Sequence, residues 1–166
     1  PIVCCSAKTQ VGITELLDAV NMCGLSPADC IHKTADGTAI APDPNGPLIA
    51  RVFRTRVDPF VQKLSFIRVY SGQLQRDDSV PASTARKPIK LGPLLSIQGE
   101  TTEAINEAAG PGDIVAIAKM DELHTGSVIG ETELEPIKFP TPMVALAVSP
   151  KSRGDETKLS GALNKV

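Results

Sequence analysis

The stretch DPFVQKLSFIRVYSGQLQRDDSV, residues 58–80, decides the fold of this 166-residue chain. Residues 64–70 are rich in β-branched and aromatic side chains, which favour a strand, and Ser71-Gly72 ends that strand. A second short strand should follow and lead through an acidic turn at Asp77-Asp78 into Val80. The stretch therefore predicts a β-meander at the centre of a small barrel, and by itself it indicates no chemistry.

The same pattern extends over residues 47–130, where short β-type runs alternate with turn residues. We expect strands over residues 49–57, 64–70, 89–97 and 114–119. The turns between them are expected at Asp58-Pro59, Asp77-Asp78, Gly99 and Gly110-Pro111-Gly112. About 84 residues with this spacing suit a closed antiparallel β-barrel better than an open sandwich.

The first 24 residues carry a different pattern. Residues 1–5 form an apolar run typical of a buried parallel strand, and residues 6–9 interrupt it. Residues 13–20 then repeat apolar side chains at helical spacing, and Gly24 fits a C-terminal helix cap. A single strand cannot cover the apolar face of such a helix. Residues 1–24 are therefore interpreted as the last strand and helix of an incomplete α/β domain.

Connecting and terminal segments complete the expected organisation. Residues 25–46 carry proline and glycine without a sustained period, which is typical of a connecting loop. Residues 140–150 read as one more strand with prolines at its ends, and Asp155 can cap a helix over residues 155–166. We therefore expect residues 131–166 to begin another incomplete domain.

The composition is that of a globular protein, with 42% hydrophobic and 22% charged residues and a net charge of −2. This balance argues against a disordered tail, and 3% aromatic residues leave few stacking surfaces for single-stranded nucleic acid. The four cysteines lack metal-site spacing and are expected to be reduced thiols rather than two disulfides: Cys4, Cys5, Cys23 and Cys30.

The expected compartment follows from what the sequence lacks. It has no signal peptide, no apolar run near the length of a membrane span and no N-glycosylation sequon. We therefore expect a cytoplasmic protein with neither a membrane nor DNA as its partner. Because the chain starts without Met inside a strand-like run, we also expect it to be an excised piece.

Charge is distributed unevenly along the predicted barrel. Residues 47–90 hold nine Lys or Arg against three acidic residues, a local net charge of +6. Residues 91–130 hold one Lys against six acidic residues, a local net charge of −5. Such polarity favours a basic face for phosphates and an acidic face for a protein partner. The alternative is that neighbouring strands interleave these charges on a solvated surface, and the sequence leaves both open.

Several motifs resemble those of translational GTPases. Ser6-Ala7-Lys8, which follows an apolar run and precedes a helix, resembles their last guanine-recognition loop. Asp58-Pro59-Phe60 and the residues from Lys63-Leu64 to Ser71-Gly72 resemble the second domain of elongation factor G. Residues 110–117 (GPGDIVAI) and 124–126 (HTG) fit the closing strands of that domain. A last set of residues resembles the opening of the third domain of elongation factor G: Phe139-Pro140, Pro142, Val148, Pro150-Lys151 and residues 155–163.

This resemblance covers essentially the whole chain and implies its domain organisation. Residues 1–24 would be the last strand and helix of a GTP-binding domain, and residues 25–46 a connecting loop. Residues 47–130 would be domain II, a closed antiparallel β-barrel of the translation-protein type. Residues 131–166 would be the start of domain III. The fold class is thus mostly β, with an incomplete α/β piece before the barrel and a strand-helix piece after it.

The resemblance also implies a function for a longer parent protein. That parent would use GTP and Mg²⁺ to drive ribosomal translocation, with the ribosome as partner, and Ser6, Ala7 and Lys8 would present backbone amides to the guanine base. The Gly-Lys pair of a P-loop, the magnesium ligands and the switch segments do not occur here. We therefore expect neither a cofactor nor a catalytic residue in this chain by itself.

Five cations are the candidate contacts to phosphates of ribosomal RNA, because charges on a rigid barrel give affinity and orientation without reading bases. The resemblance places this domain against the small ribosomal subunit. The alternative for each cation is a solvated charge or a local ion pair. The candidates are Lys63, Arg68, Arg86, Lys87 and Lys90.

The remaining polar residues indicate local structure rather than chemistry. His32 and His124 are too far apart to suggest a helical metal pair, and His124 is expected in a turn. Two adjacent acids in a strand turn point to different sides, which argues against a metal at Asp77-Asp78. Asp77 stands where the family usually has Gly, and an Asp tolerates the left-handed conformation of that turn.

Two rival functions stay open. The resemblance itself extends to elongation factor G or an elongation factor G-like GTPase. The first rival is a ribosome-protection or ribosome-recycling paralog, which would share this barrel and differ in domains outside the chain. The second is a non-enzymatic RNA- or protein-binding barrel that uses its basic half as the binding face.

Overall fold

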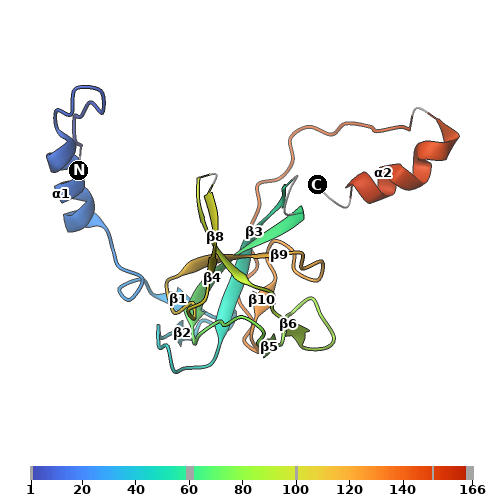
Figure 1. Ribbon diagram of the computed structural model, residues 1–166, viewed down its shortest axis with the longest axis horizontal. Helices are drawn as coiled ribbons and strands as arrows, with labels where there is room; N and C mark the ends of the chain where they lie inside the picture. The colour runs from blue at the N-terminus through green and yellow to red at the C-terminus, as the bar shows by residue number, and fades with distance from the viewer. Residues whose placement is uncertain (1, 59–61, 100, 151, 164–166) are drawn as a thin grey trace.

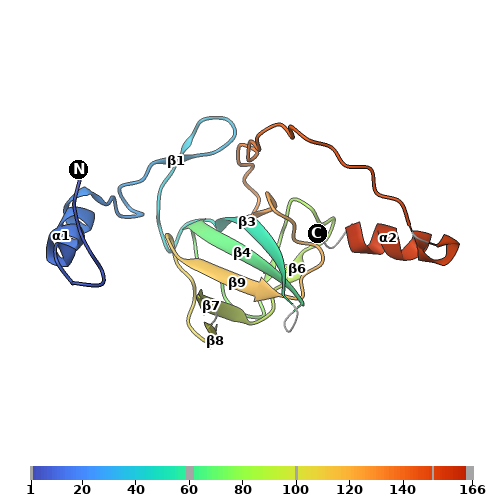
Figure 2. The ribbon, with the colours of Figure 1, turned by 90° about the horizontal axis from the view of Figure 1, so that it is seen from above.

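The computed structural model describes residues 2–58, 62–99, 101–150 and 152–163. A central body of β-strands lies between two helices, which extend away from it on opposite sides (Figures 1 and 2). The helices are α1 (Ile13–Cys23) and α2 (Glu156–Leu163), and a 3₁₀ turn, η1 (Arg153–Asp155), precedes α2. In the part of the chain that is described, no helix is long and apolar enough to cross a membrane.

Six antiparallel strands form the main sheet, in the order β10-β3-β4-β9-β7-β8. Two further pairs, β1-β2 and β5-β6, are separate hairpin-like sheets. The bounds are β1 (His32–Lys33), β2 (Ala39–Ile40), β3 (Ile49–Asp58), β4 (Gln62–Ser71), β5 (Ser79–Val80), β6 (Ile89–Lys90), β7 (Leu94–Gln98), β8 (Thr101–Ile105), β9 (Ile114–Ala118) and β10 (Val128–Ile129).

The predicted closed ring of strands is seen only in part. Among the described residues, strand pairing gives an open six-stranded sheet with β10 and β8 at its edges. An isolated bridge between Ala82 and Ile129 connects the β5-β6 segment to β10. Pro81, Pro88 and Pro93 border β5, β6 and β7, and proline has no N–H to donate to a longer ladder. The pairing of these strands is therefore short.

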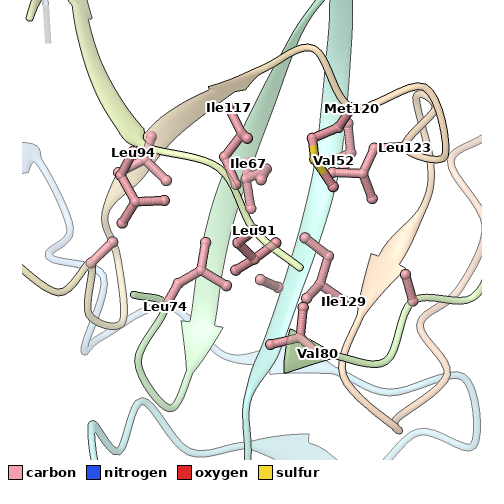
Figure 3. Close-up of a cluster of buried hydrophobic side chains, with 14 of the residues drawn as sticks. Val52, Ile67, Leu74, Val80, Leu91, Leu94, Ile117, Met120, Leu123 and Ile129 are labelled. Carbon is pink, nitrogen blue, oxygen red and sulfur yellow. The ribbon is translucent and has the colours of Figure 1, made fainter. Parts of the chain in front are cut away.

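One hydrophobic core lies between the main sheet and the segment that carries β5 and β6 (Figure 3). Val52 on β3, Ile67 on β4 and Ile117 on β9 point from the sheet into this core. Val80 of β5 and Leu91, just after β6, enter it from the other side. Fully burying each such side chain stabilises the fold by about 1.5–3 kcal/mol. This core holds the loops around β6 and β9 in place.

The central strand predictions agree with the structure at three of four places. The predicted strands at residues 49–57, 64–70 and 114–119 are β3, β4 and β9. The predicted strand at residues 89–97 is instead two strands, β6 and β7, because Gly92-Pro93 interrupts the run. The prediction omitted β8, whose TTEAI sequence is mostly exposed at the sheet edge and has no buried alternation.

The two strands predicted outside residues 47–130 are wrong for the described residues. Residues 2–5 and 140–150 lie in no strand. A strand is stable only when a neighbouring backbone satisfies its N–H and C=O groups, and no described strand lies beside either segment. Their apolar side chains are accordingly exposed, as at Met143 and Leu146.

Both predicted helices occur in the described residues, whereas the capping role of Asp155 stays a prediction. Gly24 is the C-cap of α1, and its N–H donates to the carbonyl oxygen of Val20 at 2.8 Å. At the other end, Asp155 lies in η1 directly before α2, and its carboxylate accepts hydrogen bonds from the Ser152 hydroxyl at 2.8 Å and the Lys158 ammonium at 3.1 Å. The last three residues of the second predicted helix, 164–166, lie outside the described residues.

Candidate nucleic-acid interface

We call the part of the chain from β3 to β10 the β-body. A groove of about 660 Å³ on the β-body gathers four cationic side chains. Three come from the segment around β6 and one from the residue that follows β9. One carboxylate, that of Glu122, lines it among the residues that are described. We call this set the basic groove: Arg86, Lys87, Lys90 and Lys119. All four side chains are exposed, so they can reach a polyanion without first leaving a buried partner.

Buried neighbours hold the two walls of the basic groove. Ile89 and Met120 are each less than a tenth exposed and belong to the core. Lys90 directly follows Ile89, and Lys119 directly precedes Met120, so each lysine is next to a buried residue. Lys119 has a left-handed backbone with φ 61°, and its N–H donates to the carbonyl oxygen of Lys63 at 2.8 Å. The Thr84 hydroxyl donates to the Glu122 carbonyl oxygen at 2.6 Å and joins the two loops. The backbone at Lys90 and Lys119 is therefore anchored by the core, and Thr84 ties the loop that carries Arg86 and Lys87 to Glu122.

Lys90 takes part in a local ion pair. Its Nζ lies 3.1 Å from Asp77 Oδ1, and Arg76 Nε lies 3.3 Å from Asp77 Oδ2. The hydrogen bond and charge of Lys90, followed by the charge of Arg76, hold the pKa of the Asp77 carboxyl below its ordinary value. Asp77 has φ 67°, as expected for an Asp in the place of a turn glycine. For Lys90, the local ion-pair alternative therefore applies.

The other two predicted RNA contacts lie outside the basic groove. Lys63 Nζ lies 3.2 Å from the Asp121 carbonyl oxygen and 3.4 Å from His124 Nδ1. Arg68 is half-buried on β4, where its cross-strand neighbour on β3 is Arg51. The structure thus brings together three of the five predicted cations, Arg86, Lys87 and Lys90, and it places Lys63 and Arg68 elsewhere.

Sequence reasoning missed Lys119. Its signal was hidden because it is the one Lys in the acidic stretch of residues 91–130. The pairing of β4 with β9 brings that stretch beside the basic one, so that Lys119 and Glu122 share a groove with Arg86. The basic residues before position 90 and the mainly acidic stretch after it are therefore not separated on the surface, because both contribute side chains to this groove.

Ser6, Ala7 and Lys8 lie in a turn before α1, in the terminal region that extends away from the β-body (Figure 1). The Ser6 N–H donates to the Val11 carbonyl oxygen at 2.9 Å, which closes the turn. Gly12 completes it with φ 73°, and any Cβ there would collide with the carbonyl oxygen of Cys4. Ala7 and Lys8 are exposed. Their role toward guanine stays a prediction.

The histidines and cysteines form no metal centre in the part of the chain that is described, where no group of three or more potential ligands occurs. His32 packs against the ring of Tyr70 with centroids 4.6 Å apart. His124 lies in a turn, because its carbonyl oxygen accepts from the Ser127 N–H at 2.9 Å. All four cysteines are free thiols.

Comparison with known proteins assigns the chain to a family. The family model described as elongation factor G domain 2 matches residues 47–132, which include the whole basic groove. Elongation factor G of Fervidobacterium nodosum is 33% identical over 175 aligned residues, covering all of this chain and 25% of that protein. A crystal structure of a protein from Thermus thermophilus is similar with a TM-score of 0.71 and 28% identity, covering 95% of this chain and 23% of that one.

The chain thus spans about a quarter of the length of the curated relative that it matches. More than half of its residues fall within the matched domain, and the match includes the six-stranded sheet and its core. On these grounds the chain belongs to the elongation factor G family.

Proposed function

We propose that this chain is the ribosome-contacting and signal-relaying part of a translation elongation factor, and that the basic groove binds phosphates of ribosomal RNA. The observation that carries the proposal is the gathering of three exposed cations, Arg86, Lys87 and Lys119, in one groove. Lys90, which is paired with Asp77, adds a fourth positive charge to it. Phosphate contacts of this kind position a protein on RNA without reading sequence.

The geometry of the groove suits an RNA backbone better than separated bases. Its apolar lining comes from aliphatic residues such as Ala85, Pro88 and Ile89, and no aromatic ring lines it among the described residues. Stacking of bases on aromatic rings, which supports binding of single strands, is therefore not available there. The cations instead favour a structured RNA that is recognised by its shape and its phosphates.

The wider assignment is part of the same proposal. Residues 1–24 would end a GTP-binding domain, residues 25–46 connect it to a translation-protein barrel at residues 47–130, and residues 131–166 begin the third domain. A cytoplasmic parent would bind GTP and Mg²⁺ outside this chain and use hydrolysis to drive translocation. Ser6, Ala7 and Lys8 would contribute to its guanine site. The support is the resemblance of the motifs and the similarity to elongation factor G.

The test is binding of the chain to small-subunit ribosomal RNA over a range of salt concentrations. We expect the logarithm of the binding constant to fall linearly with the logarithm of the salt concentration. Replacing Arg86 and Lys87 together by Gln should reduce the magnitude of that slope by about 1.5, which is the loss of two phosphate contacts. The matched control replaces Lys8 and Lys158, two exposed cations on the terminal segments, by Gln.

The control should leave both the slope and the affinity unchanged. An equal loss in the two double variants, or absence of salt-dependent binding, would contradict an RNA contact at the basic groove. Nucleotide titration of the longer parent separately tests the GTPase assignment. A parent that fails to bind GTP would leave only the RNA-binding module.

A further inference from the structure

A second cavity lies where the connecting loop and the chain after β10 cross the main sheet. Its volume is about 550 Å³, and it shares no lining residue with the basic groove. Residues of β1, β3 and β4 line it together with residues 134–136 and Lys138. We call it the junction pocket and define it by the side chains that the argument uses: His32, Lys33, Arg51, Tyr70, Glu135 and Lys138.

Contacts between distant parts of the chain build this pocket. Thr34 and Leu134 form an isolated antiparallel bridge, and the Ala35 N–H donates to the Glu133 carbonyl oxygen at 3.0 Å. His32 packs against Tyr70 of β4 at a tilt of 59° between the rings. Two connecting segments are thereby held on the same sheet, so the walls of the pocket are formed before any ligand arrives.

The junction pocket has an excess of positive charge. Lys33, Arg51 and Lys138 line it, against the carboxylate of Glu135. That carboxylate is already paired, because its Oε1 lies 2.8 Å from Lys138 Nζ. The pair lowers the pKa of Glu135 and raises the pKa of Lys138, so both groups stay charged near neutral pH. Arg51 also interacts with this carboxylate through its charge, because it contributes to the lowered pKa of Glu135. Lys33 has no carboxylate partner among the described lining residues, and one carboxylate is shared by the other two cations.

Arg51 is a lining residue of the junction pocket with a buried donor that has no hydrogen-bond partner among the described residues. Its Nη2 donates to the Glu135 carbonyl oxygen at 2.5 Å, whereas its buried Nε has no acceptor within the described part of the chain. Its cross-strand neighbour on β4 is a second cation, Arg68. A buried N–H group without an acceptor is unfavourable, and the planar set of donors of a guanidinium fits a phosphate in a bidentate way.

We propose that the junction pocket is a binding site for a phosphate group, with Arg51 and Lys33 as its cationic ligands and Tyr70 as one wall. The site is independent of the basic groove and of the function proposed for it. The phosphate can belong to a free anion or to an RNA backbone, and the two sources share the same chemistry at the pocket.

The experiment titrates the ¹⁵N-labelled 166-residue chain with inorganic pyrophosphate and, in a second arm, with a short RNA oligonucleotide. We expect saturable shifts of the amide signals of His32, Lys33, Arg51 and Tyr70 with a dissociation constant of about 1 mM or lower. Saturation by pyrophosphate identifies a site for a free anion, and saturation by RNA alone identifies a backbone contact. Either result supports the phosphate site.

Two variants keep the proposal open to refutation. Lys33→Ala changes an exposed side chain and should weaken binding about tenfold without altering the fold, because one charge-assisted hydrogen bond is lost. Arg51→Lys keeps the charge, removes the planar donor set and should also weaken binding. The double variant Arg86→Gln and Lys87→Gln should bind pyrophosphate as tightly as the unsubstituted 166-residue chain does. Absence of saturable shifts in both arms, or unchanged binding in Lys33→Ala, would overturn the proposal.

Discussion

The β-body and the terminal segments carry similar apolar patterns, but their apolar side chains are buried in the first and exposed in the second. Ile67 and Leu94 of the β-body are completely buried, whereas Met143 and Leu146 of the C-terminal segment are 94% and 87% exposed. Local pattern forms α1 as readily as it forms β3, yet α1 has no buried residue. The periodicity of apolar residues therefore favours a helix or a strand, whereas burial of its apolar face requires a second surface that packs against it.

The largest test of this comparison is truncation of an apolar side chain in each region. Ile67→Ala removes buried volume beneath β4 and should lower the free energy of unfolding by about 2–5 kcal/mol. Leu146→Ala removes a side chain that touches solvent and should change it by less than about 0.5 kcal/mol. Urea denaturation of both variants measures the two values. Equal losses would mean that the C-terminal segment is buried in solution.

A second, somewhat smaller contrast uses two glycines. Gly130 has φ 116°, and a Cβ there would collide with the Leu48 carbonyl oxygen, so Gly130→Ala should destabilise the β-body by about 2–3 kcal/mol. Gly161 lies inside α2 with open space around it. Gly161→Ala should instead raise the helical signal in circular dichroism and favour α2 by about 1 kcal/mol. A destabilised β-body in Gly161→Ala would contradict the independence of the two regions.

Two buried hydroxyl groups sharpen the description of the β-body itself. Ser127 Oγ accepts the His124 N–H at 2.9 Å, whereas the buried Ser65 Oγ has no partner among the described residues. Ser127→Ala should cost about 1–3 kcal/mol, because it leaves that N–H unpaired. Ser65→Ala should cost less than about 0.5 kcal/mol or stabilise slightly, since it removes an unpaired polar group. Thermal unfolding of the two variants compares them, and a larger loss for Ser65→Ala would indicate a partner for its hydroxyl.

The smallest effect concerns exposed ion pairs, which should behave alike in the two regions. The pKa of Asp77 is lowered mainly by Lys90, and that of Asp155 mainly by Ser152 and then Lys158; the ordinary value of both is 3.8. A lowered carboxyl pKa stabilises the folded state above the unfolded pKa, and this contribution disappears as the pH falls through the folded pKa. Lys90→Gln should raise the pKa of Asp77 toward 3.8, as carboxyl NMR titration would measure.

Added salt serves as the control for that titration. Because the Asp77–Lys90 ion pair is exposed, added salt should screen it and raise the pKa of Asp77 in the unsubstituted chain. Salt should have a smaller effect on the pKa of Asp77 in Lys90→Gln. An unchanged Asp77 pKa in the variant would show that another group causes the shift.

Much of the β-body could be predicted because its signals are local. β3, β4 and β9 are runs of β-branched and aromatic residues bounded by turn residues, and Asp77 occupies a left-handed turn position with φ 67°. β8 has no such signal, since its side chains are mostly exposed. Its existence depends on pairing with β7, which the residues of β8 do not reveal.

Less of the candidate interface could be predicted. Arg86, Lys87 and Lys90 are close in sequence, so their clustering follows from local structure. Lys119 joins them only because β9 ends beside that segment, and Lys63 leaves the set because its ammonium group reaches the loop that contains Asp121 and His124. Counting charges along the chain detects neither event.

The sequence by itself determined the family, the central strands, the two helices and the turn at Asp77, because these depend on residue types within a few positions of one another. Tertiary structure alone decided that residues 2–5 and 140–150 are not strands, that Lys119 enters the basic groove, and that Arg51 faces the junction pocket. The reason is physical: a hydrogen-bonded ladder, a groove and a charge cluster each need groups from distant parts of the chain, and only folding brings those groups together.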